Sequence, residues 1–260
     1  MRRIVVMGDL HCGALGGITP QGWFADGDEK PHLRKLQEEM WREYRILARE
    51  NSEPDILIIN GDTIDGNGYR SGGTEQVTTD RLEQCDMAIK AIQQFNAKKI
   101  LMTYGTGYHT GDGEDFENVI AEKLDAEIHN HLIADIDGVV FDVKHHVGGS
   151  SVPHGRHTAV AKEKLWGELW AKNESRSGGD VIIRSHVHYF AYCGGFLGNK
   201  QWLGMTLPAL QAPAFNKYGG RRCSGTVDWG LVSFEVTEGV YTWNAQVQRL
   251  SQAQSKVLKV

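Results

Sequence analysis

The sequence predicts an α/β fold in which two β-sheets pack together. In residues 1–185, short apolar runs typical of buried strands alternate with charged segments that have helical periodicity. In residues 189–248 the pattern changes to alternating and aromatic stretches separated by glycines, which is typical of antiparallel strands. We therefore expect helices on the faces of a first sheet, and a second sheet of the later strands packed against it.

Each element has a local signal. The segment 32–51 carries apolar residues three and four positions apart, and Pro54 ends it. Thr79 or Asp80 can cap the second helix. Strands are expected at 3–7, 55–59, 98–104, 138–146 and 180–185, helices at 32–51, 79–95, 114–125 and 158–173, and antiparallel strands at 201–207, 231–236 and 240–247.

Length and composition are those of one domain. The 260 residues are 40% hydrophobic and 23% charged, so 1–250 is expected to form a single domain followed by a polar tail at 251–260. No apolar run is long enough to span a bilayer. The first apolar run is broken at Gly8 and Asp9, which favours a strand over a signal peptide.

Charge and cysteine content narrow the function classes. The formal net charge is −5, and the basic stripe that duplex-binding proteins use is missing. Bound metal ions would add positive charge that the composition does not count, so nucleic acid stays open as a substrate. The cysteines show no C-x-x-C spacing, which favours a reducing compartment, and a cytoplasmic location is expected. They are Cys12, Cys85, Cys193 and Cys223.

Aspartate and histidine residues follow five of the predicted strands. In open α/β sheets, ligands bind at the carboxyl ends of the strands, so these side chains are expected to meet at one edge. Asp9 and His11 are two residues apart, as are His186 and His188, so each pair can point the same way from extended chain. The residues concerned are Asp9, His11, Asp62, Asp65, His109, His145, His146, His186 and His188.

Mixed carboxylate and imidazole side chains are typical ligands of manganese, iron or zinc. A shared carboxylate can bridge two such ions, and the pair can activate hydroxide while it binds phosphoryl oxygens. The pattern therefore predicts a centre of two divalent transition-metal ions, with manganese favoured and iron, zinc or nickel as alternatives.

At these motifs the chain resembles the calcineurin-like metallophosphoesterases. The ordered family motifs D-x-H, G-D-x-x-D, G-N-H-D/E, a strand-end H and G-H-x-H are similar to segments 8–11, 61–65, 105–109, 145–146 and 185–188. The resemblance covers about residues 3–190. It implies a four-layer αββα sandwich, with two mixed sheets face to face and flanking helices, and it implies hydrolysis of a phosphate ester.

The resemblance assigns metal-binding roles to the matching residues. Asp9, His11 and His188 would hold the first metal. Asp62 would bridge both metals. His186 would hold the second metal together with one histidine of the strand-end pair at 145–146.

That histidine pair leaves an alternative open. His145 and His146 point to opposite faces of an extended strand, so one of them is expected to be a ligand, and His145 is favoured. By the same resemblance, His109 would give a proton to the leaving oxygen, and Asp65 would orient and charge His109.

The third motif departs from the family pattern. The family places an Asn on the second metal directly before the catalytic His, whereas this chain has Gly105-Thr106-Gly107-Tyr108-His109. Thr106 is therefore a candidate for contacting substrate or a water ligand, and weaker binding of the second ion is expected. Some phage-encoded members of the family are similar here, which suggests a phage origin and, with it, the host cytoplasm as the location.

Two arginines are candidates for binding the substrate phosphate. Arg156 lies at a predicted helix start, where phosphate binds favourably, although a solvated cap is the alternative. Arg221 lies in a Gly-Gly-Arg-Arg segment that is equally well explained as a basic turn.

The predicted function is metal-dependent hydrolysis of a phosphate ester, with a phosphodiester favoured and a nucleotide or nucleic acid as candidate substrates. An amidohydrolase-like metal hydrolase is an alternative, but such enzymes usually carry H-x-H on the first strand, the reverse of the order here. A non-catalytic module that binds metal or nucleic acid is a third reading, because the third motif is altered. The sequence indicates no membrane partner and does not indicate an oligomeric state.

Overall fold

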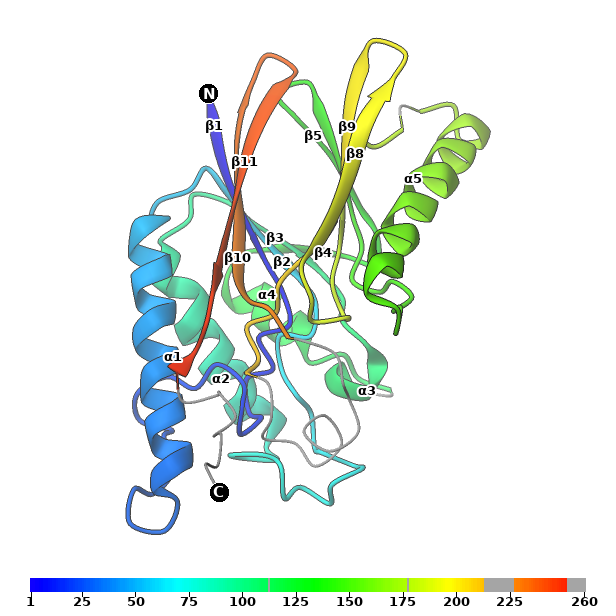
Figure 1. Cartoon of the computed structure of the whole chain (residues 1–260). Helices are drawn as coiled ribbons and strands as arrows, with labels where there is room; N and C mark the ends of the chain where they lie inside the picture. Colours follow the sequence, from blue (N-terminus) through cyan, green and yellow to red (C-terminus); the bar gives the residue numbers. More distant parts are fainter. Residues whose placement is uncertain (112, 177, 213–226, 252–260) are drawn as a thin grey trace, which may run out of the picture.

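Parallel pairing of consecutive strands builds the first sheet (Figure 1). The computed structural model describes residues 1–111, 113–176, 178–212 and 227–251. The strands of this sheet are β1 (Arg2–Met7), β2 (Ile56–Asn60), β3 (Ile100–Thr103), β4 (Glu127–His129), β10 (Trp229–Thr237) and β11 (Val240–Gln248). Their order is β11-β10-β1-β2-β3-β4, and β1 to β4 are parallel neighbours whereas β10 and β11 run antiparallel.

The second sheet is also mixed. Its strands are β5 (Leu132–Ile136), β6 (Val139–Val143), β7 (Val181–Arg184), β8 (Ala191–Leu197) and β9 (Lys200–Thr206), in the order β5-β6-β7-β9-β8. The central strands β6, β7 and β9 are parallel, and each outer strand is antiparallel to its neighbour. The carboxyl ends of β6 and β7 therefore lie at one edge of this sheet.

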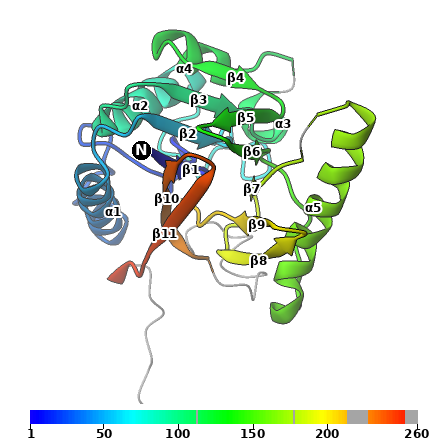
Figure 2. The ribbon, with the colours of Figure 1, turned by 90° about the horizontal axis from the view of Figure 1, so that it is seen from above.

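Helices complete a four-layer arrangement (Figure 2). They are α1 (Pro31–Glu50), α2 (Arg81–Ile92), α3 (Gly107–Thr110), α4 (Glu117–Lys123) and α5 (Arg156–Asn173), with 3-10 turns at Gln93–Phe95 and Pro153–Gly155. Seen from above, α1, α2 and α4 cover the first sheet and α5 covers the second. The predicted sandwich of two mixed sheets with flanking helices is confirmed. None of the helices in the described part of the chain is both long enough and apolar enough to cross a membrane.

Alternation along the strands explains the layers. In β1, Val5 and Met7 pack with the apolar side of α1, whereas Ile4 and Val6 pack between the two sheets. Successive side chains of a strand point to opposite faces, so a strand buried on both faces reads as a continuous apolar run. For this reason the apolar segments of the sequence predicted the positions of the buried strands.

The partners of the last strands differ from the prediction. Strands β10 and β11 belong to the first sheet, where β10 is antiparallel to β1. Their assignment to the second sheet is wrong, because alternation shows that a strand is half-buried but not which strand it pairs with. The predicted polar tail at 251–260 lies outside the described residues except for Ser251.

Several short elements are absent from the sequence prediction, namely β4, β5, β8 and α3. The hairpin between β5 and β6 had a usable signal. Asp137 and Gly138 both have positive φ, 52° and 86°, and Asp-Gly is a preferred pair for such tight turns. The other elements are short or largely exposed, so their patterns are weak.

Glu117 on α4 ties together the loops that follow β2 and β3. Its side chain is fully buried. One carboxylate oxygen accepts the Thr63 N–H at 2.9 Å and the other accepts the Gly105 N–H at 2.7 Å. Burial raises the pKa of Glu117 to about 7, against the effect of these backbone hydrogen bonds. A single carboxylate thus fixes the spacing of two loops.

We expect Glu117→Gln to destabilise the protein by about 1–3 kcal/mol, because its NH₂ group would face a backbone N–H that now has an acceptor. Urea denaturation followed by circular dichroism measures this change. The matched control is Glu122→Gln, an exposed position on the same helix. Equal unfolding free energies for the two variants would show that Glu117 does not hold the loops.

Candidate metal centre

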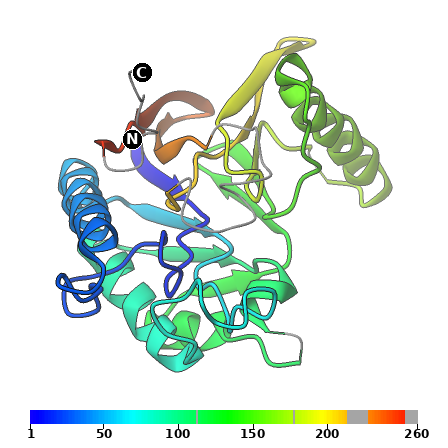
Figure 3. The same cartoon turned by 60° about the horizontal axis from the view of Figure 1, so that its bottom comes forward.

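The aspartates and histidines at the strand ends converge at one edge of the sandwich. Figure 3 shows this edge, with the loop after β1 in dark blue and the loop after β2 in cyan. The two loops are bridged in parallel at Cys12 and Ile64. The loops that follow β6 and β7 carry His145, His186 and His188 to the same place, because these strands are parallel in the facing sheet.

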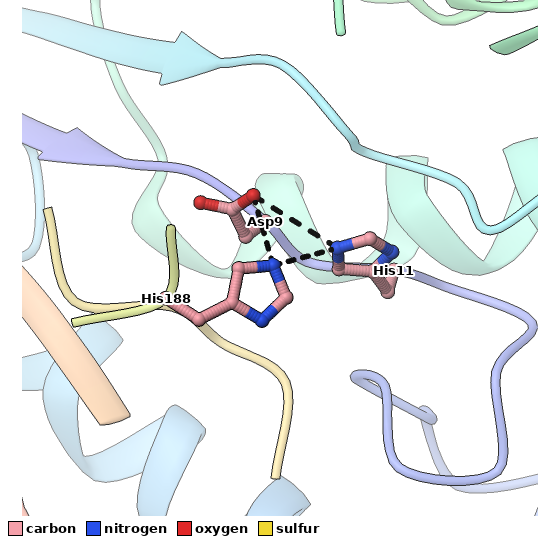
Figure 4. A group of neighbouring side chains, drawn as sticks. All are labelled: Asp9, His11 and His188. Carbon is pink, nitrogen blue, oxygen red and sulfur yellow. Dashed lines mark hydrogen bonds and ion pairs between the residues drawn. The ribbon is translucent and has the colours of Figure 1, made fainter. Parts of the chain in front are cut away.

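A first group consists of Asp9, His11 and His188 (Figure 4). The Nε2 atom of His188 lies 3.2 Å from Asp9 Oδ1 and 3.2 Å from His11 Nε2. His11 Nε2 lies 3.9 Å from Asp9 Oδ1. Three ligand atoms from residues far apart in the sequence therefore face one point.

A second group consists of Asp62, His145 and His186. His145 Nε2 lies 3.0 Å from Asp62 Oδ2, and its other ring nitrogen lies 2.7 Å from the backbone oxygen of Asn60. Asp62 also reaches the first group, since its Oδ2 is 4.0 Å from His11 Nε2. It therefore lies between the two groups.

Of the two neighbouring histidines, the structure places only His145 in this cluster. His145 is buried, whereas His146 is exposed and belongs to none of the candidate groups found among the described residues. The ring of His146 instead lies 4.7 Å from that of His186.

The backbone turns sharply at most of these residues. Asp9, His11, Asp62, His186 and His188 all have positive φ values, between 45° and 72°. Non-glycine residues adopt this region rarely and at a cost, and such strain gathers at functional sites. The turns at the strand ends are what direct these side chains into the cleft between the sheets.

The cluster fits divalent metal ions. Asp9 Oδ1 and His145 Nε2 are buried and lie 3.2 Å from His188 Nε2 and 3.0 Å from Asp62 Oδ2, respectively, but neither contact has the geometry of a hydrogen bond. An unpartnered buried polar atom costs about 1–3 kcal/mol, so such atoms call for an explanation. A metal ion in each group would satisfy them, and carboxylate with imidazole is a donor set suited to manganese, iron or zinc.

Asp65 contacts two histidines. Its Oδ1 lies 2.9 Å from His11 Nδ1 and 3.3 Å from His109 Nδ1. The same His109 nitrogen lies 2.9 Å from the backbone oxygen of Asp65, and Gln76 donates to Asp65 Oδ2 at 2.8 Å. Asp65 therefore fixes the orientation of both rings and leaves their Nε2 atoms to face the cleft.

Thr106 stands where the family has Asn and contacts the carboxylate between the two groups. Its N–H donates to Asp62 Oδ1 at 2.6 Å, and its hydroxyl lies 3.1 Å from the same atom. A Cβ at Gly105 would lie 2.3 Å from Asp62 Oδ1, so only glycine allows this approach. The altered motif thus positions Asp62 through Thr106.

Their surroundings divide the histidines into two kinds. Burial is the main cause that lowers the pKa of His11, and it lowers the pKa of His186 to about 4. Burial opposes a charge on His109, but Asp65 and a second carboxylate outweigh it and raise its pKa to about 9. At neutral pH, His11 and His186 have a free lone pair, whereas His109 carries a proton that it can donate.

The cluster opens into a cleft of about 440 Å³. Thr106, His109 and His188 line it, as do Arg70, Gln76 and Tyr108, which the sequence analysis did not single out; the lining also includes Asp62 and Asp65. Arg156 does not line it, because its guanidinium lies 4.3 Å from the ring of Tyr189. Arg221 lies outside the described residues.

The site residues that the sequence analysis did not single out differ in the strength of their sequence signal. Glu117 was detectable as a charged residue at a position with the helical spacing of the buried Ile120 and Ala121. Gln76 and Arg70 lie in a glycine-rich loop without periodicity, so no local pattern distinguishes them from solvated residues.

Comparisons with solved structures give remote similarities. A metallophosphoesterase from Sphaerobacter thermophilus is 12% identical, covering 95% of this chain and 89% of that one with a TM-score of 0.38. Vps29 of Chaetomium thermophilum is 11% identical, covering 95% and 96% with a TM-score of 0.46. The Thermotoga maritima protein TM1076 is 13% identical, covering 95% and 100% with a TM-score of 0.41.

Comparison with curated proteins gives no match. The family assignment comes instead from a match to a sequence profile. The profile described as calcineurin-like phosphoesterase matches residues 2–205, which include every residue of the candidate metal groups. The match covers well over half of the chain and agrees with the fold and with the strand-end motifs. The chain belongs to the calcineurin-like phosphoesterase family.

Proposed function

We propose that this protein hydrolyses a phosphodiester at a centre of two divalent transition-metal ions. The observation that carries the proposal is the pair of adjoining Asp/His groups, whose ligand atoms lie within 4.8 Å of one another in each group. Asp62 lies between them and is the proposed bridge. Manganese is the favoured metal, with iron, zinc or nickel as alternatives.

Each ligand follows from its position. Asp9, His11 and His188 would hold one ion, and His145 and His186 would hold the other. When bound, the two ions would supply Lewis-acid charge that lowers the pKa of water and neutralises phosphoryl oxygens. The residues of the chain supply the geometry, since positive-φ turns at most of the proposed ligands and the parallel strands fix their positions in advance.

His109 is the proposed proton donor to the leaving oxygen. In the metal-free protein the neighbouring carboxylates, Asp65 foremost, outweigh burial and raise its pKa to about 9, and it lines the same cleft as the proposed ligands. Asp65 holds its Nδ1 from two sides, by carboxylate and by backbone oxygen, so that Nε2 faces the substrate. A fixed imidazolium of this kind is an effective general acid.

The charge of the cleft supports a diester over a monoester. Arg70 is the one Lys or Arg side chain among the described residues that line it. A monoester dianion carries one more negative charge than a diester and needs more positive charge from its site. A nucleotide or nucleic-acid diester is the substrate class that we propose.

Loss of a ligand is expected to remove activity. Asp62→Asn and His186→Ala should each lower turnover of bis(p-nitrophenyl) phosphate with Mn²⁺ by more than about 100-fold, the upper cost of losing an outer-sphere partner. Asp86→Asn is the matched control, because Asp86 is an exposed residue paired with Lys123 at 3.0 Å. Full activity in either ligand variant, with native circular dichroism, would defeat the proposal.

Loss of His109 is expected to depend on the leaving group. His109→Ala should slow cleavage of a dinucleotide by about 10²–10⁴-fold, because an alkoxide leaves only when protonated. Release of p-nitrophenolate should suffer much less, since this anion is stable at neutral pH. Steady-state rates on both substrates give the comparison, with the exposed His129→Ala as control. Equal losses on the two substrates would exclude a proton-donor role.

Metal binding is expected to release a proton from His145. Burial opposes the charge on this ring, but Asp62 and Asp9 raise its pKa to about 10, so the metal-free protein holds the proton at neutral pH. A metal must displace it, and affinity should therefore rise between about pH 6 and about pH 9. Calorimetric titration with Mn²⁺ in buffers of different ionisation heat measures the release.

His145→Ala should lose the buffer-dependent heat, whereas His146→Ala should keep it. A binding heat that is independent of the buffer in the unmodified protein would contradict the assignment. A loss confined to His146→Ala would exchange the roles of the two residues.

A further inference from the structure

Arg70 brings a positive charge to the mouth of the cleft. It follows the G-D-x-x-D motif by a few residues and lines the same cleft as His11, Asp62 and His109. Its side chain is exposed. In the described part of the chain, no carboxylate or carbonyl oxygen accepts a hydrogen bond from its guanidinium, so these donors are available to a ligand.

Tyr108 holds Arg70 in place. The guanidinium carbon lies 4.8 Å from the centre of the Tyr108 ring, and the Arg70 backbone N–H donates to the Tyr108 hydroxyl at 3.2 Å. A cation placed over an aromatic ring is attracted to it, and the ring restricts the motion of the long side chain.

The order of the rings places Arg70 on one side of the bond that is cut. His11, a ligand of the first proposed ion, has its ring 4.6 Å from that of His109, and the ring of His109 lies 4.9 Å from that of Tyr108. Arg70 is the next contact in this series, through the ring of Tyr108. Since His109 is the proposed donor to the leaving oxygen, the group beyond it belongs to the leaving fragment.

We infer that Arg70, positioned by Tyr108, binds a second phosphate on the leaving fragment of the substrate. This inference rests on the proposed function. The preferred substrate is then an oligonucleotide rather than a diester with a small uncharged leaving group. A guanidinium binds phosphate oxygens through paired N–H groups, which suits Arg70 to this task.

The trinucleotide TpTpT provides the test. TpTpT has two phosphodiester linkages. Whichever P–O bond the enzyme breaks, cleavage at one linkage releases a leaving fragment that still carries a phosphate, and cleavage at the other releases a nucleoside. With Mn²⁺ present, we expect the first linkage to be cut about two- to fivefold faster, the factor that an exposed ion pair supplies. Chromatography of the initial products gives the ratio.

The variants identify the residues responsible. Arg70→Ala should bring the ratio to about one, Arg70→Lys should give an intermediate value, and added salt should lower the ratio in the unmodified protein. Tyr108→Leu should lower it and Tyr69→Leu should not, because Tyr69 is 83% exposed and does not line the cleft. Arg34→Ala is a further control, since Arg34 also lies over a ring, that of Phe24, but outside the cleft.

The outcomes separate the two proposals. If neither TpTpT nor bis(p-nitrophenyl) phosphate is hydrolysed, the proposed function fails. If it is hydrolysed but TpTpT is not, if the two linkages are cut equally, or if Arg70→Ala keeps the preference, the function stands and the second-phosphate site is rejected. A preference for the opposite linkage would also overturn it, because Arg70 would then face the retained fragment.

Discussion

The parallel backbone pairing of β1 and β2 is the constraint on which the site depends. The same backbone hydrogen bonding continues into the loops that follow the two strands. Asp9 N–H donates to Gly61 O at 3.0 Å, His11 N–H to Asp62 O at 2.9 Å, and Cys12 N–H to Thr63 O at 3.0 Å. The ligand-bearing segments are therefore held side by side by the same kind of hydrogen bond as the strands, and side-chain contacts only refine a spacing that the backbone has set.

The sequence predicted the convergence of the strand-end Asp and His residues because the signal is local. A short apolar run predicts a buried strand, and an Asp or His directly after it must lie at the sheet edge. Asp9, Asp62 and His186 each satisfy this rule, and the structure brings all three to one edge. Alternation along an extended chain indicated that only one of His145 and His146 points into the site, whereas the preference for His145 came from the family motif, whose histidine is the first after the apolar strand.

Other features were out of reach because they depend on contacts between distant segments. Nothing in residues 229–248 indicates that they pair with β1 rather than with the second sheet. Thr106 could be recognised as a departure from the family motif, but its N–H contact with Asp62 depends on how the loop after β3 turns. The pairing of Arg70 with Tyr108 joins a loop to the short helix α3, two segments that are distant in sequence, and the role of either residue can be inferred only when both are in place.

The ligands also come from both sheets, with Asp9 near one terminus and His188 more than two thirds of the way along the chain. No truncated fragment that ends before β7 can assemble either group. During synthesis, the proposed ions could be bound only after that strand has emerged from the ribosome, so the aspartate-bearing loops would form first without that positive charge. An ion bound by the proposed ligands would connect early and late parts of the chain, because the first and the second candidate group each join residues of the first sheet's loops to residues that follow β7.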